Sequence, residues 1–278
     1  MQIVFGLVFV VICVIGGYLF AHGNLAVLYQ PAELIIIGGA ALGSLFISTP
    51  RSTIKQMGKA IAGGIKRKSS APQYLNLLKV LFDLATLVRK EGILALENHV
   101  ENTDSSPILS NLSKHKDLLD YMCDSLRLVL IGIEFEELSG MLEVDLETRE
   151  EEAEEPGTAL STVADALPGL GIVAAVLGII ITMGSIGGDT AEVGKHVAAA
   201  LVGTFLGVLL SYGFVGPLAH VVKSEMMHGL VLMRIAKIGI IGLSMGANPL
   251  MVCESARRAI PETDRPTFKL MEDTVRGK

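Results

Sequence analysis

Apolar residues gather in four runs, and these runs set the plan of the chain. Two open it, at 2–20 and 34–49, and two lie beyond its middle, at 166–188 and 197–219. None of the four contains a charged side chain, although Glu33 directly precedes the second. Runs of this length and composition predict four membrane-spanning helices. The first lacks the basic start of a signal peptide and a second run follows almost at once, so we interpret the pair as a retained hairpin.

Basic residues predict the orientation of these spans. They cluster directly after the second run, at Arg51, Lys55, Lys59, Lys66, Arg67 and Lys68. By contrast, the connection 21–31 has no Lys or Arg, and the connection 189–196 has only Lys195. Because Lys and Arg accumulate on the cytoplasmic side, the long middle segment and both termini are expected in the cytoplasm.

The middle segment shows the spacing of amphipathic helices. Apolar residues recur at helical intervals between Leu75 and Val88, which predicts a helix that ends at Gly92. A second helix is predicted over 117–142, followed by an acidic run at 147–155 that we interpret as a solvated helix face or linker ending at Pro156.

The C-terminal tail is also expected to be helical and cytoplasmic. Its stretch 229–246 is apolar, but Arg234 and Lys237 lie near the middle. Each would cost roughly 2.5 to 3.5 kcal/mol at the centre of a bilayer, so a fifth span is rejected. We expect this stretch to pack on the middle segment, to break at Pro249 and to continue as a short helix.

The predicted fold is an all-α membrane protein with four transmembrane helices and a large helical cytoplasmic domain, formed by the loop between spans two and three plus the C-terminal tail. The expected segments are a transmembrane hairpin at 1–50, a cytoplasmic helical domain at 51–164, spans three and four at 165–219, and a cytoplasmic C-terminal segment at 220–278.

Composition agrees with this plan and excludes several functions. Half of the residues are hydrophobic, the mean hydropathy is +0.53, and the net charge of -6 leaves no basic field for nucleic acid. The three cysteines, Cys13, Cys123 and Cys253, are too scattered for a disulfide framework or a metal site. With no nucleophile–base constellation in view, we expect neither an enzyme nor a cofactor.

Small residues form stripes on the third and fourth spans. The fourth repeats them every four residues, at Ala199, Gly203, Gly207 and Ser211, and the third carries a similar face at Gly171, Ala175, Gly178 and Thr182. Such faces let helices approach at backbone distance. Tight packing within one bundle and a site for a partner helix are both compatible with this pattern.

Prolines and missing charges add to the picture. Pro168 lies near the cytoplasmic start of the third span and Pro217 near the cytoplasmic end of the fourth, so both removed backbone hydrogen bonds are expected at one membrane depth, where a hinge can form. No ionisable group is expected at the centre of a span, since Glu33 lies at an end. If ions cross here, a partner must supply the carboxylate.

These features resemble one known family over nearly the whole chain. The residues that carry the resemblance are 165–178 (DALPGLGIVAAVLG), 202–219 (VGTFLGVLLSYGFVGPLA), 29–33 (YQPAE) and the closing 265–268 (RPTF). They are similar to the MotA/PomA family of flagellar stator A subunits. The order of the four spans, the cytoplasmic insert and the acidic approach to the third span also resemble that family.

The resemblance implies a homopentamer in the bacterial inner membrane around two copies of a MotB/PomB-like B subunit. That subunit would supply a membrane aspartate and a peptidoglycan-binding domain. Pro168 and Pro217 would couple protonation of the aspartate to helix movement, with Thr204 and Tyr212 along the ion path. The family's sodium-driven members have Thr where this chain has Ala175, so protons are the expected ion.

The resemblance also implies torque delivery to the flagellar rotor switch protein FliG. The family has Arg and Glu eight residues apart, and Arg89 and Glu97 match that spacing, although Gly92 between them is able to break a helix. Asp145 fills a further acidic position of the family.

Two alternatives remain open at this stage. One is an energiser of the ExbB/TolQ type, which shares the small-residue helix pair but differs in span count. The other is a membrane scaffold or solute transporter with no motor role, although the midplane polar site and inverted repeats of a transporter are not evident.

Overall fold

The computed structural model describes residues 2–66, 71–184 and 190–277, and within these ranges it contains helices and connections but no strand. Arg67 and Lys68 of the basic cluster lie outside the described residues. The first helices are α1 (Gln2–Phe20), α2 (Leu25–Leu28), α3 (Pro31–Ser48), α4 (Arg51–Lys66), α5 (Ala71–Glu91), η1 (Ile93–Ala95), α6 (Leu96–Glu101) and η2 (Leu109–Leu112). The others are α7 (Lys116–Ile131), α8 (Phe135–Gly184), α9 (Thr190–Leu209), η3 (Leu210–Val215), α10 (Gly216–Ser244), α11 (Pro249–Arg258) and α12 (Phe268–Arg276).

Four stretches are long and apolar enough to cross a membrane. They are Gln2–Phe20, Leu25–Ser48, and parts of the long helical stretches Phe135–Gly184 and His196–Ser244. The predicted all-α architecture with four candidate membrane helices is therefore confirmed. The long stretches extend well beyond what a bilayer requires, because each continues as a helix past the apolar run.

The chain divides into two compact units, and each combines segments from separate parts of the sequence. We call Met1–Arg67 with Ala153–Met226 the membrane unit, and Lys68–Glu152 with Met227–Lys278 the helical unit. This division follows packing, whereas the four segments predicted from the sequence follow the membrane boundary. Those four segments remain a prediction.

The helical unit is built around α5. One face of this helix is fully buried, including Leu77, Leu81 and Leu84, and it packs in one core with Ile235 and Ile240 of α10 and with residues of α7 and α11. The predicted packing of the tail on the middle segment is therefore found. The predicted break is found as well, since Asn248 caps α11 with its side-chain oxygen and Pro249 follows at the first helical position.

Glycine explains where the middle helices end. Gly92 (φ 87°) ends α5 as predicted, but Gly132 (φ 85°) ends α7, so the predicted single helix over 117–142 is wrong. The Gly132 N–H bonds back to the carbonyls of Leu128 and Val129, and a new helix begins at Phe135. A left-handed glycine of this kind closes a helix because other residues adopt that conformation only with strain.

Proline, by contrast, does not end the helix that carries the acidic run. α8 continues through both Pro156 and Pro168. The run is also not simply solvated: within the helical unit Glu150 pairs with Arg234 of α10 at 3.1 Å, and within the membrane unit Glu154 pairs with Lys223 at 2.8 Å. These ion pairs and the surrounding packing are contacts that support the helix on both sides of Pro156.

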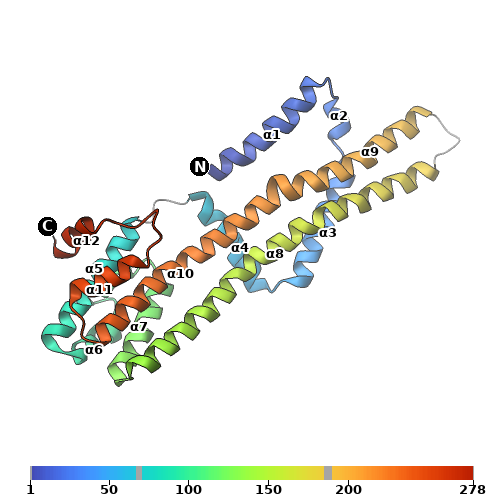
Figure 1. Ribbon diagram of the computed structural model, residues 1–278. Coiled ribbons are helices and arrows are strands. Elements are labelled where there is room, and N and C mark those ends of the chain that lie inside the picture. Colours follow the sequence, from blue (N-terminus) through green and yellow to red (C-terminus); the bar gives the residue numbers. More distant parts are fainter. Residues whose placement is uncertain (1, 67–70, 185–189, 278) are drawn as a thin grey trace. The chain divides into compact units, whose positions relative to one another are not determined.

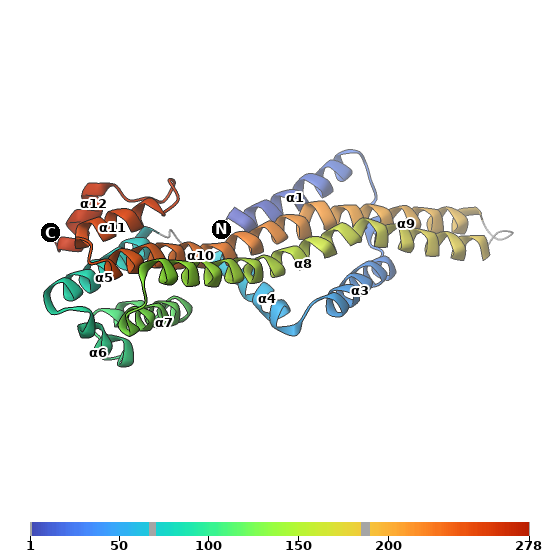
Figure 2. The same cartoon turned by 60° about the horizontal axis from the view of Figure 1, so that its bottom comes forward.

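In the membrane unit, α8 and α9 lie side by side along the spans (Figure 1, Figure 2), and α3 packs against them. A small core joins Ile37 and Ala41 of α3 to Leu167 and Ala174 of α8. A second cluster fixes α4 beneath α3, through Met57, Ala60, Leu45 and Val222. The α8–α9 pair is therefore the framework on which the membrane site is built.

Candidate functional site

Glycines bring α8 and α9 to backbone distance. A Cβ on Gly171 would lie 2.9 Å from the carbonyl oxygen of Gly203, and one on Gly207 would lie 2.6 Å from the carbonyl oxygen of Leu167. Further along, a Cβ on Gly178 would lie 3.1 Å from the Cβ of Ala200. We call this contact the α8–α9 seam. Small residues are required here because any larger side chain would push the helices apart.

The predicted packing stripe is thus largely occupied within the chain itself. Gly203 faces Ala174, Ser211 is buried, and Ala199 is half-buried. Packing inside one bundle accounts for Gly171, Gly178, Gly203 and Gly207 without a partner helix. The exposed side of the pair carries large apolar residues from α8: Ile172, Val173, Val176, Ile179 and Ile180.

The two prolines act at one level of the seam. Gly171 lies opposite Gly207 and Gly178 opposite Ala200, so the helices run antiparallel in a constant register. Pro168 leaves the carbonyl of Ala164 without a helical donor, and Pro217 does the same to Gly213. Carried along the helices, the register puts these two carbonyls level to within about one residue.

The fourth span also changes its winding just before Pro217. η3 is a π-helix, with the N–H of Gly216 bonded to the carbonyl of Ser211. Such wide turns are rare and often accompany functional sites, because they loosen the regular backbone ladder. Sequence reasoning marked Pro217 but not η3, and the only local signal was the Gly-rich approach to the proline.

The remaining predicted ion-path residues lie in different surroundings. The Cα of Thr204 approaches a Cβ built on Gly171 at 3.3 Å, so Thr204 is part of the seam, and Ala175 is half-buried on α8. Tyr212 is not brought to them: it lies in η3 and is 72% exposed. Within this chain, Thr204 and Ala175 therefore share a helix pair, whereas Tyr212 faces outward.

Glu33 is the functional candidate that sequence reasoning missed. It begins a buried stripe of α3 that continues with Ile37, Ala41 and Leu45, and it is only 6% exposed. Its Oε2 has no hydrogen-bond partner among the described residues and lies 2.7 Å from where a Cβ on Gly203 would be. The residue does lie at the end of a span, as predicted, but its carboxyl is enclosed between α3 and α9. The four-residue spacing from Glu33 to Leu45 was a sequence signal that Glu33 is buried, although it does not identify the neighbouring helix.

Hydroxyl groups line a small open cavity, of about 320 Å³, where α3 ends and α4 begins against α8. It includes Thr49, Thr158 and Thr162, and the Thr53 hydroxyl donates to the carboxylate of Glu155 at 3.3 Å. These oxygens suit water or a hydrated cation. In the described part of the chain, no three His, Cys, Asp or Glu side chains are close enough to form a metal site.

The predicted rotor-contact residues lie on two separate helices. Arg89 is on the last turn of α5 and Glu97 is in α6, with the Gly92 break and η1 between them. Both are exposed, and neither forms an ion pair among the residues that the structure describes. Their spacing therefore reflects a turn that separates two helices, and not one face of a single helix.

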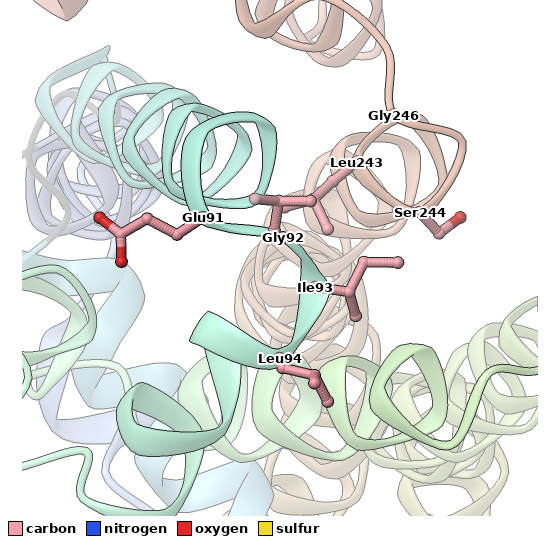
Figure 3. Close-up of a pocket in the computed structure, with 8 residues that line it drawn as sticks. Glu91, Gly92, Ile93, Leu94, Leu243, Ser244 and Gly246 are labelled. Carbon is pink, nitrogen blue, oxygen red and sulfur yellow. The ribbon is translucent and has the colours of Figure 1, made fainter.

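A hollow of about 430 Å³ opens beside this turn (Figure 3). Ile93 and Leu94 from the turn after α5 and Leu243 and Ser244 from the end of α10 gather around it, while Glu91 directs its carboxylate away (Figure 3). We call it the tip slot. Its lining is mainly apolar, and part of that lining comes from the chain segment between Arg89 and Glu97.

Asp145, the further acidic position, is held within α8. It accepts a hydrogen bond from Arg149 at 2.8 Å, and the Arg149 guanidinium lies over the ring of Tyr121. Burial, with Asp145 nearby, raises the pKa of the Tyr121 hydroxyl. Asp145 is thus part of a packed cluster, in contrast to Arg89 and Glu97, which form no ion pair in the described part of the chain.

Known proteins with similar sequences identify the family of this chain. The model of the family "Motility protein A N-terminal" matches residues 4–92, and that of the "MotA/TolQ/ExbB proton channel family" matches residues 114–234. The chain is 37% identical to Motility protein A of Salmonella typhimurium over 100% of its own length and 96% of the relative's. It is 35% identical to the chemotaxis protein LafT of Vibrio parahaemolyticus, over 98% and 97% of the two chains.

The fold agrees with these matches. The solved structure of C. jejuni MotAB superposes with a TM-score of 0.78, covering 96% of this chain and 98% of that one at 20% identity. The family model of the second match describes proton channels and not enzymes. With its four candidate membrane helices, its glycine-lined helix pair and its full-length similarity, the chain belongs to the Motility protein A family.

Proposed function

We propose that this chain is the A subunit of a flagellar stator, which couples ion flow across the inner membrane to torque on the rotor. The observation that carries the proposal is the tight α8–α9 seam, with Pro168 in α8 and Pro217 just after η3 on its two helices, in a chain of the Motility protein A family. Backbone freed from regular hydrogen bonding is tolerated in a membrane only where protein or water satisfies it. A seam of this kind can therefore change its packing when a neighbouring group changes charge.

A MotB/PomB-like subunit completes the ion path in this proposal. The structures similar to this one are MotAB complexes, which supports such a partner. The partner helix brings the carboxylate that binds and releases the ion, and the ring is a homopentamer of this chain around two such helices. A unit charge moving across 100 mV releases roughly 2.3 kcal/mol, enough to bias a helix rearrangement at each step.

Protons are the proposed ion. Ala175 has no hydroxyl oxygen that could ligate a dehydrated sodium ion, at the position where the sodium-driven members of the family have Thr. Swimming is expected to persist when external sodium is removed and to stop when the proton gradient is collapsed. Motility that follows sodium and ignores the proton gradient would assign the other ion.

The proposed topology places both termini in the cytoplasm of a multi-pass inner-membrane protein. Alkaline phosphatase fused after the C-terminus is expected to be inactive, because that enzyme requires the periplasm.

The N-terminal match over residues 4–92 is to a motility family model, which favours a stator over an ExbB/TolQ-type energiser.

Torque is proposed to pass to the rotor switch protein FliG through Arg89 and Glu97. Both are exposed and unpaired in the described residues, so reversing either charge is expected to leave the fold intact. We expect Arg89→Glu or Glu97→Lys to reduce swimming speed severely while membrane assembly and ion flux stay near normal. Lys269→Glu, an exposed charge on α12, is the matched control. If the charge reversals instead abolish assembly, the two charges serve the fold and not the rotor.

A further inference from the structure

The tip slot provides a second, apolar component of the rotor contact. We propose that it anchors one large apolar side chain from an amphipathic helix of the rotor protein, while the surrounding charges set the register of that helix. This inference rests on the proposed function but goes beyond it, because charge contacts alone do not require a slot.

The shape of the slot favours a side chain as the occupant. Its volume of about 430 Å³ admits a Leu, Met or Phe side chain with room for adjustment, but not a helix. Leu94 forms an exposed lip, at 74% exposure, whereas Leu243 is buried and forms the floor. In the proposed contact, the partner helix lies across the opening and inserts one apolar residue.

Two left-handed glycines hold the walls in place. Gly92 (φ 87°) ends α5 on one side of the slot, and Gly246 (φ 66°) follows the end of α10 on the other. Both turns close onto the core of the helical unit, since Val88 and Leu243 belong to that core. A preformed site loses little conformational entropy when a partner binds.

Charges of both signs surround the opening. Arg89 and Lys90 precede it on α5, and Glu91 and Glu97 flank the turn. All four are exposed and none forms an ion pair within the described residues. An apolar centre with a polar rim is the usual anatomy of an energetic hot spot at a protein interface. The matching partner is a helix with an apolar anchor and flanking residues of both charges, placed one turn apart.

A matched pair of substitutions at Ser244 tests the slot. Among the described residues, the Ser244 hydroxyl bonds to its own helix alone, donating to the Ile241 carbonyl at 2.9 Å, so its loss removes no hydrogen bond between helices there. Ser244→Phe fills the slot from inside, whereas Ser244→Ala leaves it open. For the intact A–B complex and purified FliG, we expect Ser244→Phe to weaken binding roughly tenfold and Ser244→Ala to change it little. Equal binding of FliG by the two variants would contradict the proposal that the slot is part of the rotor contact.

Photo-crosslinking in motile cells separates this inference from the proposed function. The photo-crosslinking residue p-benzoylphenylalanine is placed at one of three positions. At Leu94 it reports on the slot, at Glu97 on the charge contact, and at the exposed control Ile131 on the background. We expect adducts with FliG from Leu94 and Glu97 but not from Ile131, with the Leu94 adduct on or beside an apolar FliG residue. Adducts from Glu97 alone would contradict the proposal that the slot anchors an apolar side chain, but they would leave the proposed function intact. No FliG adduct from either position would overturn both.

Discussion

Gly171 and Gly207 meet across the α8–α9 seam with no room for a side chain on either, since a Cβ on Gly207 would lie 2.9 Å from the Cα of Gly171. Contacts this close involve backbone on both sides, and backbone cannot rotate away as a side chain can. The seam is therefore tightly packed, which makes it sensitive to single methyl groups.

Gly207→Ala is expected to destabilise the assembled protein. The added methyl would meet the Leu167 carbonyl at 2.6 Å, and overpacking of this kind costs roughly 1 to 3 kcal/mol. Gly169→Ala is the matched control, because a Cβ there meets nothing within 4 Å. Thermal unfolding of the purified complex measures both. Equal melting temperatures for the two variants would show that the seam is looser than described.

Glu33→Gln is expected to preserve assembly. A charged carboxylate enclosed without a partner is costly, so a neutral side chain of the same shape should fit the space between α3 and α9. Glu33→Lys should prevent assembly, because it buries an unpaired cation beside Gly203. Membrane yield and gel filtration of the complex distinguish the two. Loss of assembly in the Gln variant would mean that the charge itself is needed.

Pro168→Ala is expected to leave the complex assembled but abolish swimming. Alanine restores an N–H for the Ala164 carbonyl and removes a residue that costs about 3 kcal/mol inside a helix, so α8 becomes stiffer. Pro156→Ala is the control, since it makes the same change earlier in α8, outside the apolar span. Normal swimming by the Pro168 variant would exclude a hinge at that position.

Acid is expected to loosen α11 through Glu254. Hydrogen bonds from the Arg257 guanidinium, at 2.7 and 2.9 Å, hold the pKa of Glu254 at about 2, below its usual 4.5. A depressed carboxylate pKa stabilises the fold above the usual value, and this contribution is lost as the pH falls from about 4.5 towards 2. Its size is roughly 1.5 to 3 kcal/mol.

Hydrogen exchange of the α11 amides on the purified chain measures this effect. Protection should fall between pH 5 and 2.5, and Glu254→Gln should lower protection at neutral pH and flatten the pH profile. Glu262→Gln, at an exposed acidic residue, should behave like the unaltered chain. A profile in the Glu254 variant that is as steep as in the unaltered chain would assign the acid sensitivity to other groups.

The membrane plan and the seam were predictable because both depend on local patterns. Uncharged runs mark the spans, and glycines every four residues mark a close helix contact, as Gly203 and Gly207 show. The end of α5 at Gly92 follows from the same local reasoning. These patterns do not show which surface each small-residue stripe packs against. In the structure, the stripes of α8 and α9 pack against each other within one chain.

The predictions that were wrong concern residues whose local sequence is compatible with two structures. Gly132 ends a helix and Gly140 does not, because only Gly132 adopts the left-handed backbone. Pro156 looked like a stop signal, yet α8 continues through it with ion pairs on both sides. Burial of Glu33 depends on a contact with Gly203, which is distant in sequence. The spacing of residues within α3 does not identify that contacting residue.

Ion flux in reconstituted vesicles tests the central claim most directly. With a proton gradient imposed, vesicles that contain this chain together with its B subunit are expected to conduct, and vesicles that contain this chain alone are expected to match empty lipid. The expectation follows because the described apolar stretches of α8 and α9, 166–184 and 197–209, contain no Asp or Glu, and the carboxylate beside the seam, that of Glu33, is enclosed between α3 and α9. Conduction by the chain alone at the level of the joint assembly would contradict the account.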